Sequence, residues 1–183
     1  VYLDWSAVST NIGFRDLGGW QWRYASKQGD QLTINEVYRT EKFYLGGGSA
    51  NDYLRGLGPD RGSFNDTLSG AVGNDTLAGY QGVDVINGGT GIDLYIGDFT
   101  NLASGVRVDI NAGVQVKAMA DGSGSLGAIV AVERLNLQGS AGDDVFTANA
   151  GQYADNFVTH GGDDVVSTGR GVDTLWTGDG LDT

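Results

Sequence analysis

The chain has 183 residues, among them 32 glycines, one proline and no cysteine, and its formal net charge is −12. This acidity argues against binding to nucleic-acid backbones and to anionic membrane surfaces, and it favours cations as partners. The lack of cysteine excludes disulfides and thiol chemistry. No apolar run reaches the length of about 18 residues that a membrane-spanning helix needs.

At 40% hydrophobic residues the chain can build a core, so it is not a disordered acidic chain. A small extracellular protein without disulfides needs another kind of cross-link, and a metal ion is the obvious candidate. The sequence begins with Val-Tyr-Leu-Asp-Trp-Ser, which is no signal peptide and does not start with Met. We therefore expect a fragment of a longer protein.

The first part of the chain has few glycines and alternates apolar with polar side chains. Ile12 and Phe14 recur at period two, and so do Trp20, Trp22 and Tyr24, which is the spacing of half-buried strands. Turns are expected at residues 18–19 and 27–30, and a further strand at 31–38. No helical apolar stripe occurs, so the pattern predicts short strands joined by turns.

A nine-residue pattern begins at Gly47 and continues to Ile96. Its three regular units have glycine in the fourth place, aspartate in the sixth and a large apolar side chain in the eighth; they are residues 70–78, 79–87 and 88–96. Two less regular units, 47–55 and 61–69, precede them. The insertion between these two contains Pro59, which cannot lie in a central strand and therefore predicts a loop. A fixed period of this kind sets the fold.

From Gly97 the pattern of the first half begins again. Residues 4–6 match 98–100 at an offset of 94, residues 41–45 match 133–137 at 92, and residues 82–84 match 171–173 at 89. Collinear matches of this kind indicate a duplicated unit of roughly ninety residues. We therefore expect two copies, 1–96 and 97–183. Each has a flank of alternating strands, 1–46 or 97–138, followed by a glycine–aspartate block, 47–96 or the degenerate 139–183.

The nonapeptides resemble the Gly-Gly-X-Gly-X-Asp-X-U-X repeat of the RTX (repeats-in-toxin) family, in which U is a large apolar residue. The resemblance covers both blocks, nearly half of the chain, and extends more weakly to the flanks. It implies an all-β fold, a right-handed parallel β-roll or β-solenoid with two RTX blocks separated by longer-strand flanking segments. It also implies that the turns bind Ca²⁺, partly through backbone carbonyls.

The residue types at this spacing suit a hard cation. Two units close one rung, so that aspartates eighteen residues apart stack at one edge, about 4.8 Å from each other. Carboxylates at that spacing repel by roughly 3 kcal/mol per pair at an effective dielectric of ~20. An oxygen-binding cation such as Ca²⁺ reverses the sign. We expect Asp66 and Asp84 to share one edge, and Asp75 and Asp93 the other.

The predicted calcium ligands are the sixth-place aspartates and, by family resemblance, the turn glycines with their carbonyls. The aspartates are Asp52, Asp66, Asp75, Asp84, Asp93, Asp144, Asp164, Asp173 and Asp182. The glycines are Gly70, Gly73, Gly79, Gly82, Gly88, Gly91, Gly162, Gly171 and Gly180. The alternative is a metal-free β-solenoid whose aspartates only favour turns, above all over residues 139–160.

The second block is less regular, and its register is open where it begins. Asp164 and Asp182 should share an edge, with Asp173 opposite. Asp155 lies nine residues before Asp164, whereas Asn156 aligns better with the first block. We expect fewer calcium ions here than in the first block.

No catalytic constellation is present in the sequence. His160 is the single histidine and has no cysteine or second histidine as partner, and there is no His-Glu-X-X-His motif. Residues 122–126 match Gly-X-Ser-X-Gly only in part and predict a loop. The chain is therefore expected not to be an enzyme.

The expected function is a calcium-binding β-roll region of a secreted bacterial protein, of the toxin or adhesin type, outside the cell or on its surface. Family resemblance implies type I secretion machinery as a partner. It also implies a chain that is disordered where Ca²⁺ is scarce and folds outside. Binding to the folded state alone favours folding, and extracellular sites need affinities of only ~10⁻⁴–10⁻³ M. Contact with a membrane or host surface is expected only through the rest of the parent protein.

Two other classes of function stay open. The first flank is rich in aromatic side chains, namely Trp5, Trp20, Trp22, Tyr24, Phe43 and Tyr44. They either pack in the core or form the contact surface of an adhesion or ligand-binding module. The chain could also be a non-catalytic accessory region of a secreted enzyme.

Overall fold

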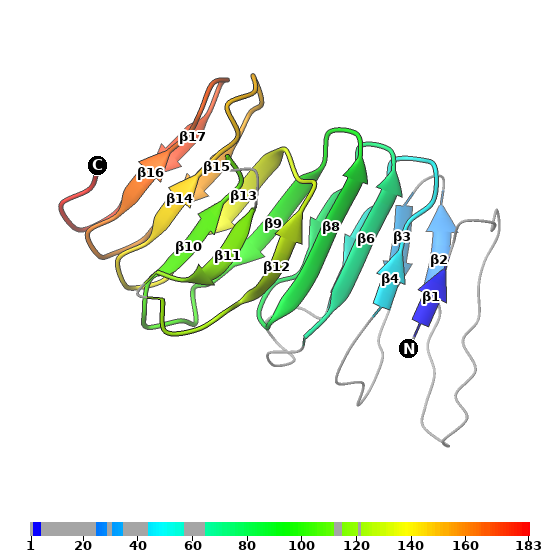
Figure 1. The fold of residues 1–183 in the computed structure, drawn as a ribbon, viewed down its shortest axis with the longest axis horizontal. Helices are drawn as coiled ribbons and strands as arrows, with labels where there is room; N and C mark the ends of the chain where they lie inside the picture. Colours follow the sequence, from blue (N-terminus) through cyan, green and yellow to red (C-terminus); the bar gives the residue numbers. More distant parts are fainter. Residues whose placement is uncertain are drawn as a thin grey trace, which may run out of the picture.

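The computed structural model describes residues 44–56, 65–111, 115–120 and 122–183, and the backbone of three earlier strands, Tyr2–Asp4, Ala25–Gln28 and Gln31–Ile34. These residues form an elongated roll of β-strands, with the two chain termini at opposite ends of its long axis (Figure 1). This part of the chain contains no helix, and accordingly none with the length and apolar character needed to cross a membrane.

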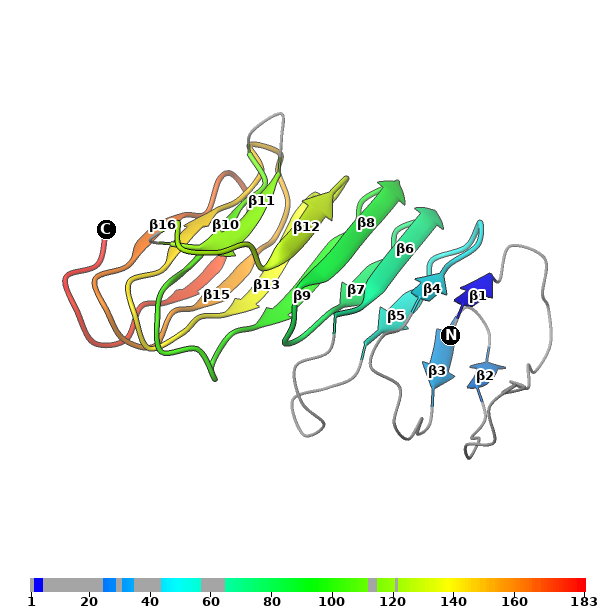
Figure 2. The same cartoon turned by 60° about the horizontal axis from the view of Figure 1, so that its bottom comes forward.

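The roll has two faces. One of them, here named the continuous face, is a six-stranded parallel sheet in the order β5-β7-β9-β13-β15-β17. Its strands are β5 (Tyr53–Arg55), β7 (Thr76–Ala78), β9 (Leu94–Asp98), β13 (Arg134–Gln138), β15 (Asn156–Val158) and β17 (Thr174–Trp176). Neighbours in this sheet are separated in sequence by strands of the other face, so the chain winds around a common core (Figure 2).

The opposite face, here named the split face, consists of two sheets in the orders β1-β4-β6-β8-β12 and β11-β10-β14-β16. The first contains β1 (Tyr2–Asp4), β4 (Tyr44–Gly46), β6 (Thr67–Val72), β8 (Asp84–Thr90) and β12 (Gly127–Val130). The second contains β10 (Val106–Asp109), β11 (Val116–Met119), β14 (Val145–Thr147) and β16 (Val165–Ser167). A separate antiparallel hairpin is formed by β2 (Ala25–Gln28) and β3 (Gln31–Ile34), and β3 lies near β5 of the continuous face.

The eighth side chain of each nonapeptide points into the space between the faces. Leu77, Ile86 and Tyr95 are fully buried, as their place in the period predicts. In the second block the ring of Phe146, from the split face, stacks on that of Phe157, from the continuous face, with 5.9 Å between the ring centroids. The all-β parallel roll expected from the period is thus confirmed.

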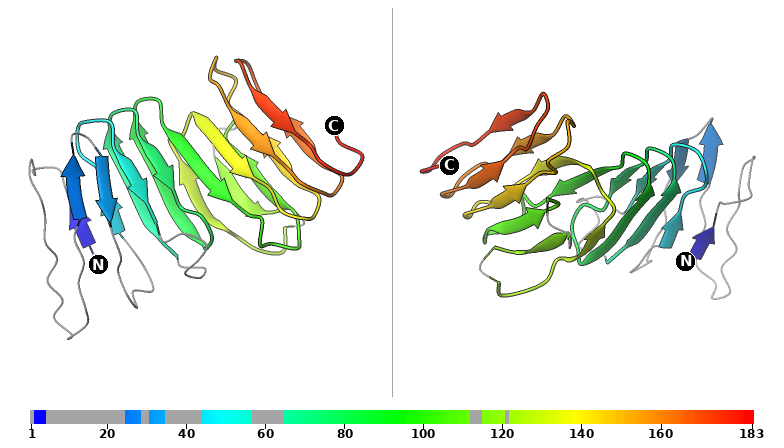
Figure 3. Two further views of the ribbon diagram at one scale, coloured as in Figure 1. Left: turned by 180° about the vertical axis from the view of Figure 1, so that it is seen from behind. Right: turned by 45° about the horizontal axis from the view of Figure 1, so that its top comes forward.

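The split face is interrupted where the second flank leaves the regular winding. After β9 the chain forms the antiparallel pair β10 and β11, and only then returns through β12 to the side of β8. On the continuous face, β9 and β13 remain direct neighbours from Leu94 opposite Arg134 to Asp98 opposite Gln138. One face therefore holds strands that the other lacks, and the C-terminal rungs are inclined relative to β6 and β8 (Figures 1 and 3).

Strand pairings of the two proposed copies correspond, although the corresponding strands lie on opposite faces. Leu3 of β1 pairs with Leu45 of β4 on the split face, and Gly97 of β9 pairs with Leu137 of β13 on the continuous face. These partners are related by the offsets of 94 and 92 residues seen in the sequence.

The hairpins repeat the same relation. Ser26 pairs with Thr33 in the β2–β3 hairpin, and Ala118 pairs with Ser125 after β11, so that both partners are shifted by 92 residues. The division into copies 1–96 and 97–183 stays a prediction; under it, the corresponding pairings lie half a rung apart.

The first flank differs in one detail from its prediction. Lys27 and Gln28 were expected in a turn but belong to β2, because the hairpin register pairs them with Leu32 and Gln31 of β3. Of the strand expected at 31–38, the structure describes Gln31–Ile34. Other expectations fall outside the described residues: the strands at 12–14 and 20–24, the turn at 18–19, the loop around Pro59, and the aromatic side chains before Tyr44.

Candidate metal centre

Aspartates that end the turns stack in rows at both edges of the roll. At the edge that leads into the continuous face, the Asp52 N–H donates to Asp75 Oδ1 (2.7 Å) and the Asp75 N–H donates to Asp93 Oδ1 (2.7 Å). Each carboxylate thus holds the backbone of the preceding rung. We name this row the first ladder; it consists of Asp52, Asp75, Asp93, Glu133, Asp155 and Asp173.

The first ladder crosses the second flank without a gap. The Asp93 N–H donates to Glu133 Oε2 (2.9 Å), so a glutamate takes the place of an aspartate on that rung. The Leu135 N–H then donates to Asp155 Oδ1 (2.6 Å), and the Asp155 N–H to Asp173 Oδ1 (3.0 Å). Carboxylates therefore follow one another along this edge through both blocks.

The second ladder lies at the opposite edge and consists of Asp66, Asp84, Asp144, Asp164 and Asp182. The Asp66 N–H donates to Asp84 Oδ1 (2.9 Å). In the second block the Asp144 N–H donates to Asp164 Oδ1 (2.8 Å) and the Asp164 N–H to Asp182 Oδ1 (3.1 Å). Between Asp84 and Asp144 the ladder is interrupted by the strands of the second flank. The structure thus brings together the aspartate pairs that the period placed at common edges.

In four ladder carboxylates, only one of the two oxygens accepts a hydrogen bond from the described residues. In the described part of the chain, no hydrogen-bond partner exists for the buried Oδ2 atoms of Asp75, Asp93, Asp155 and Asp164. These side chains are at most 3% exposed. Burying an ionised oxygen without a partner is costly, so each of these atoms requires either a proton or a cation.

The electrostatics of the carboxylates point in the same direction. Burial is the main cause that raises the pKa of Asp75 to about 6, with further contributions from the negative charges of Asp93 and Asp52. Burial also raises the pKa of Asp93, Asp155 and Glu133. These groups hold protons more strongly than free carboxylates do, and a divalent cation beside them would reverse that preference.

Turn glycines leave room for a cradle of oxygen atoms. A Cβ on Gly70 would collide with Asp75 Oδ2 and with the carbonyl oxygen of Gly88. A Cβ on Gly88 would in turn collide with Asp93 Oδ2 and with the carbonyl oxygen of Ala131. Carboxylate and carbonyl oxygens of consecutive rungs therefore converge at the place where a side chain would stand.

The fourth-place glycines let the chain turn toward this cradle. They adopt φ values that are open to glycine, and they are Gly73 (+135°), Gly82 (+130°), Gly91 (+143°), Gly162 (+111°), Gly171 (+145°) and Gly180 (+149°). A side chain on Gly73 would also strike the Ala50 carbonyl of the preceding rung. The glycine spacing is thus required by both the backbone and the close approach of rungs.

The donor set fits Ca²⁺. Within the described residues, no three His, Cys, Asp or Glu side chains lie close enough together to hold a metal ion. A metal in these turns therefore needs backbone carbonyls beside the carboxylate. Ca²⁺ accepts such mixed sets of oxygen ligands, whereas transition metals prefer nitrogen and sulfur.

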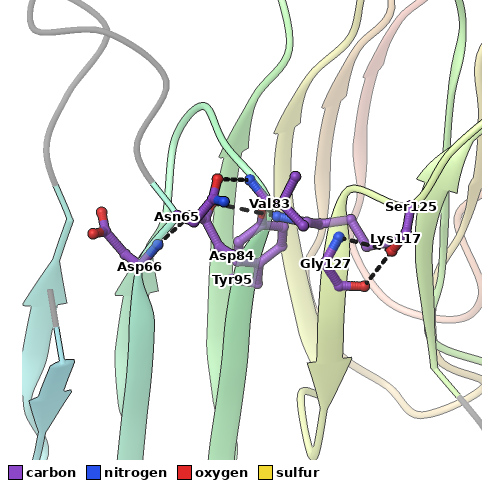
Figure 4. Close-up of polar contacts among 8 residues, drawn as sticks. All are labelled: Asn65, Asp66, Val83, Asp84, Tyr95, Lys117, Ser125 and Gly127. Carbon is purple, nitrogen blue, oxygen red and sulfur yellow. Dashed lines mark hydrogen bonds and ion pairs between the residues drawn. The ribbon is translucent and has the colours of Figure 1, made fainter. Parts of the chain in front are cut away.

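Other ladder carboxylates have their second oxygen occupied by the protein. The Gly48 N–H donates to Asp52 Oδ2 (2.7 Å), and the Ser140 N–H donates to Asp144 Oδ2 (2.8 Å). At Asp84 the Oδ2 atom meets the ammonium of Lys117 (Figure 4). The predicted aspartate ligands are therefore not equivalent, although all of them lie in the ladders.

A comparison with protein families agrees with this geometry. The family model of the RTX calcium-binding nonapeptide repeat (4 copies) matches residues 60–95, 136–152 and 149–183. The matched residues are RTX repeats. Calcium is the ligand of such repeats, and RTX repeat regions are typically non-catalytic parts of proteins that are generally secreted. A comparison with curated proteins gives no significant match.

Three residues of the ladders and their ion pair, Asp155, Glu133 and Lys117, were not predicted from the sequence. Asp155 belongs to the first ladder, and its spacing of eighteen residues from Asp173 carried the signal, whereas Asn156 bonds its side chain to Asn136 (2.9 Å). Glu133 and Lys117 lie outside the nonapeptide period. No spacing rule could have assigned them to a turn of the RTX blocks.

An outer row of hydrogen bonds was also missed. The fifth residue of a unit accepts the backbone N–H of the next rung, as in Asn74 N–H to Asn51 Oδ1 (2.7 Å) and Ile92 N–H to Asn74 Oδ1 (2.9 Å). The second block repeats it with Asp163 N–H to Asp143 Oδ1 (2.8 Å). These exposed bonds fix the stacking of turns, and their signal was the Asn or Asp that precedes some of the ladder aspartates, such as Asn74 before Asp75 and Asp143 before Asp144.

Proposed function

We propose that this chain is the calcium-dependent β-roll region of a secreted bacterial protein of the toxin or adhesin type, and that it folds when it meets Ca²⁺ outside the cell. The observation that supports this most is the set of buried carboxylate oxygens of Asp75, Asp93, Asp155 and Asp164, which have no hydrogen-bond partner among the described residues. Without a cation, like charges stacked on consecutive rungs oppose the folded state.

The chain's own residues prepare the sites. In the proposed ligands one carboxylate oxygen accepts a backbone N–H, as Asp93 Oδ1 accepts the Asp75 N–H, and this bond fixes the direction of the other oxygen. Turn glycines keep the space beside that oxygen free of side chains. When bound, Ca²⁺ supplies the positive charge between rungs, and the folded state gains stability because the unfolded chain offers no such cradle.

Location and partners belong to the same proposal. A glycine-rich acidic chain has a large ordering entropy to overcome, so it stays unfolded where Ca²⁺ is scarce. The family resemblance implies passage through type I secretion machinery, and this coupling favours folding at the cell exterior or surface. We propose Asp75, Asp93, Asp155 and Asp164, with neighbouring glycine carbonyls, as the calcium ligands of highest occupancy.

The experiment is a calcium titration of the full chain followed by far-UV circular dichroism and tryptophan fluorescence. In EDTA we expect loss of the β-spectrum, and in millimolar Ca²⁺ we expect its recovery. Mg²⁺ at the same concentration is the control, because its octahedral demand fits these turns poorly. An identical β-rich spectrum in EDTA and in Ca²⁺ contradicts calcium-driven folding.

A further inference from the structure

The flank that splits one face brings a buried cation to the second ladder. Lys117 lies on β11, and its side chain is completely buried. Its Nζ is 3.4 Å from Asp84 Oδ2 and 3.3 Å from the Tyr95 hydroxyl oxygen, and it lies 5.5 Å from the centroid of the Tyr95 ring. Figure 4 shows the Lys117 side chain reaching across from β11 toward Asp84 and Tyr95.

One carboxylate oxygen of Asp84 makes the usual ladder hydrogen bond, whereas the other forms an ion pair with Lys117. Its Oδ1 accepts the Asp66 N–H (2.9 Å), as Asp93 Oδ1 and Asp164 Oδ1 accept an N–H of the preceding rung. Its Oδ2 meets an ammonium, whereas Asp93 Oδ2 and Asp164 Oδ2 are buried without a hydrogen-bond partner in the described residues. Asp84 therefore differs from Asp93 and Asp164 in its Oδ2 atom, which is the oxygen that faces the proposed metal site in the other two residues.

The rung after Asp84 differs as well. Its strand partner is Gly127 of β12, so no Gly-X-Asp turn follows Asp84 at this edge. A Cβ on Gly127, whose φ is +110°, would collide with the Asp84 carbonyl oxygen, so the two backbones lie in direct contact. The carbonyl cradle that consecutive nonapeptides build is thus incomplete on this side.

We propose that the Lys117 ammonium takes the place of Ca²⁺ at Asp84, so that this position of the second ladder is neutralised without metal. The inference deepens the proposed function and rests on it, because it assumes calcium at the other turns. The ammonium has three donors, and Asp84 and Tyr95 accept from two of them. Ca²⁺ at its usual distance of about 2.3–2.6 Å from Asp84 Oδ2 would be repelled by that buried charge.

The first test counts bound ions by calorimetric titration of the full chain with CaCl₂. D84N is expected to bind as many Ca²⁺ ions as the unchanged chain, with less than a twofold change in midpoint. D93N, the matched variant of the first ladder, is expected to lose one ion. Loss of one ion in D84N, as in D93N, would overturn the proposal.

The second test measures the pair itself through the thermal midpoint in saturating Ca²⁺. D84N leaves a buried ammonium unpaired and K117M leaves a buried carboxylate unpaired, so each is expected to lower the midpoint, and the double variant to recover at least half of the larger loss. R107Q is the control, since Arg107 is a half-exposed cation of the same hairpin that pairs with Asp109. Additive losses would overturn the proposal.

Failure of the Lys117 proposal can be distinguished from failure of the proposed calcium-binding function. If a single variant does not fold, the D84N/K117M protein answers the counting question, because an ion lost in this double variant also contradicts the substitution. If the unchanged chain binds no Ca²⁺, the proposed function fails, while the thermal cycle still reports whether Lys117 and Asp84 are coupled.

Discussion

The two ladders are built from the same kind of carboxylate-to-backbone hydrogen bond, but they differ where the second flank enters the roll. The first ladder passes the flank through Glu133, and the sheet behind it stays continuous from β5 to β17. The second ladder is interrupted after Asp84 and resumes at Asp144, and its face divides into two sheets. The flank thus inserts strands at one edge while the other edge carries the roll across, which shows that a repeat array tolerates an insertion as long as one row of rungs remains stacked.

The largest effect is expected from breaking the first ladder on both sides of the flank. The pair D93N and D155N removes two buried charges whose Oδ2 atoms have no hydrogen-bond partner in the part of the chain that the structure describes. We expect the calcium midpoint of folding to rise by roughly tenfold or more, because calcium affinity follows the ligand charge. D98N is the control, since Asp98 lies on β9 outside both ladders and bonds only locally to Thr100. An unchanged midpoint in the double variant contradicts the assignment of these ligands.

The next effect concerns pH and compares the ladders without calcium. Burial raises the pKa of Asp75, in the first ladder, and of Asp84, in the second, to about 6 in the folded state. Between the ordinary pKa of 3.8 and that value the folded chain binds more protons than the unfolded chain, so stability falls as the pH rises through this window. Acidification from pH 7 to pH 5 in EDTA should therefore increase the β-signal in circular dichroism.

Saturating Ca²⁺ should reverse the direction of that pH dependence. Protons compete with the metal for the same oxygens, so the calcium midpoint should rise as the pH falls through about 6. Parallel pH profiles with and without Ca²⁺ would show that the ladder carboxylates do not bind the metal.

A smaller effect on the calcium midpoint is expected from Glu133, which continues the first ladder across the second flank. E133Q keeps an oxygen that can accept the Asp93 N–H but removes the negative charge next to the Asp93 carboxylate. We expect the fold to persist and the calcium midpoint to rise by less than in D93N/D155N, because only one negative charge beside the Asp93 carboxylate is lost. Calcium titration followed by tryptophan fluorescence measures it. A rise as large as that of D93N/D155N would make Glu133 an equal ligand, and no rise would remove it from the site.

The smallest effect should come from the second ladder after the flank. Ser140 Oγ donates to Asp144 Oδ1 (2.9 Å), while the Ser140 N–H holds Oδ2 (2.8 Å). S140A removes only the hydroxyl, so we expect a loss of about 1 kcal/mol in the free energy of unfolding and no change in the number of bound ions. Chemical denaturation in saturating Ca²⁺ measures the loss. A lost ion would place Ser140 among the ligand-binding groups.

The sequence predicted the parts of the molecule that obey the period. Nine-residue spacing decides which side chains enter the core, as Leu77 and Ile86 show, and which aspartates share an edge, as Asp75 and Asp93 show. These properties are local, because each rung repeats the geometry of the one before it. Expected and observed arrangements therefore agree wherever the period is regular.

The remaining features depend on contacts between segments far apart in sequence. Lys117 reaches Asp84 across a sequence separation of 33 residues, and the Asp93 N–H reaches Glu133 across 40. Neither residue has a fixed distance to the nonapeptides, so only the three-dimensional path of the flank reveals its role. The same holds for the second block, where Asp155 and Asp164 carry free oxygens although its sequence looked poorer in ligands.

The exchange of faces between the two proposed copies has a consequence for how such chains can change length. Each nonapeptide advances the chain by half a turn, so the side on which a flank emerges depends on whether an odd or an even number of units precedes it. The β2–β3 hairpin lies near the continuous face, while β10 and β11 join the split face. Loss of one nonapeptide would move every later strand, and the β10–β11 hairpin with them, to the other side, whereas loss of two would restore it. Whether the number of repeats is odd or even thus determines on which face of the roll the flank hairpin lies.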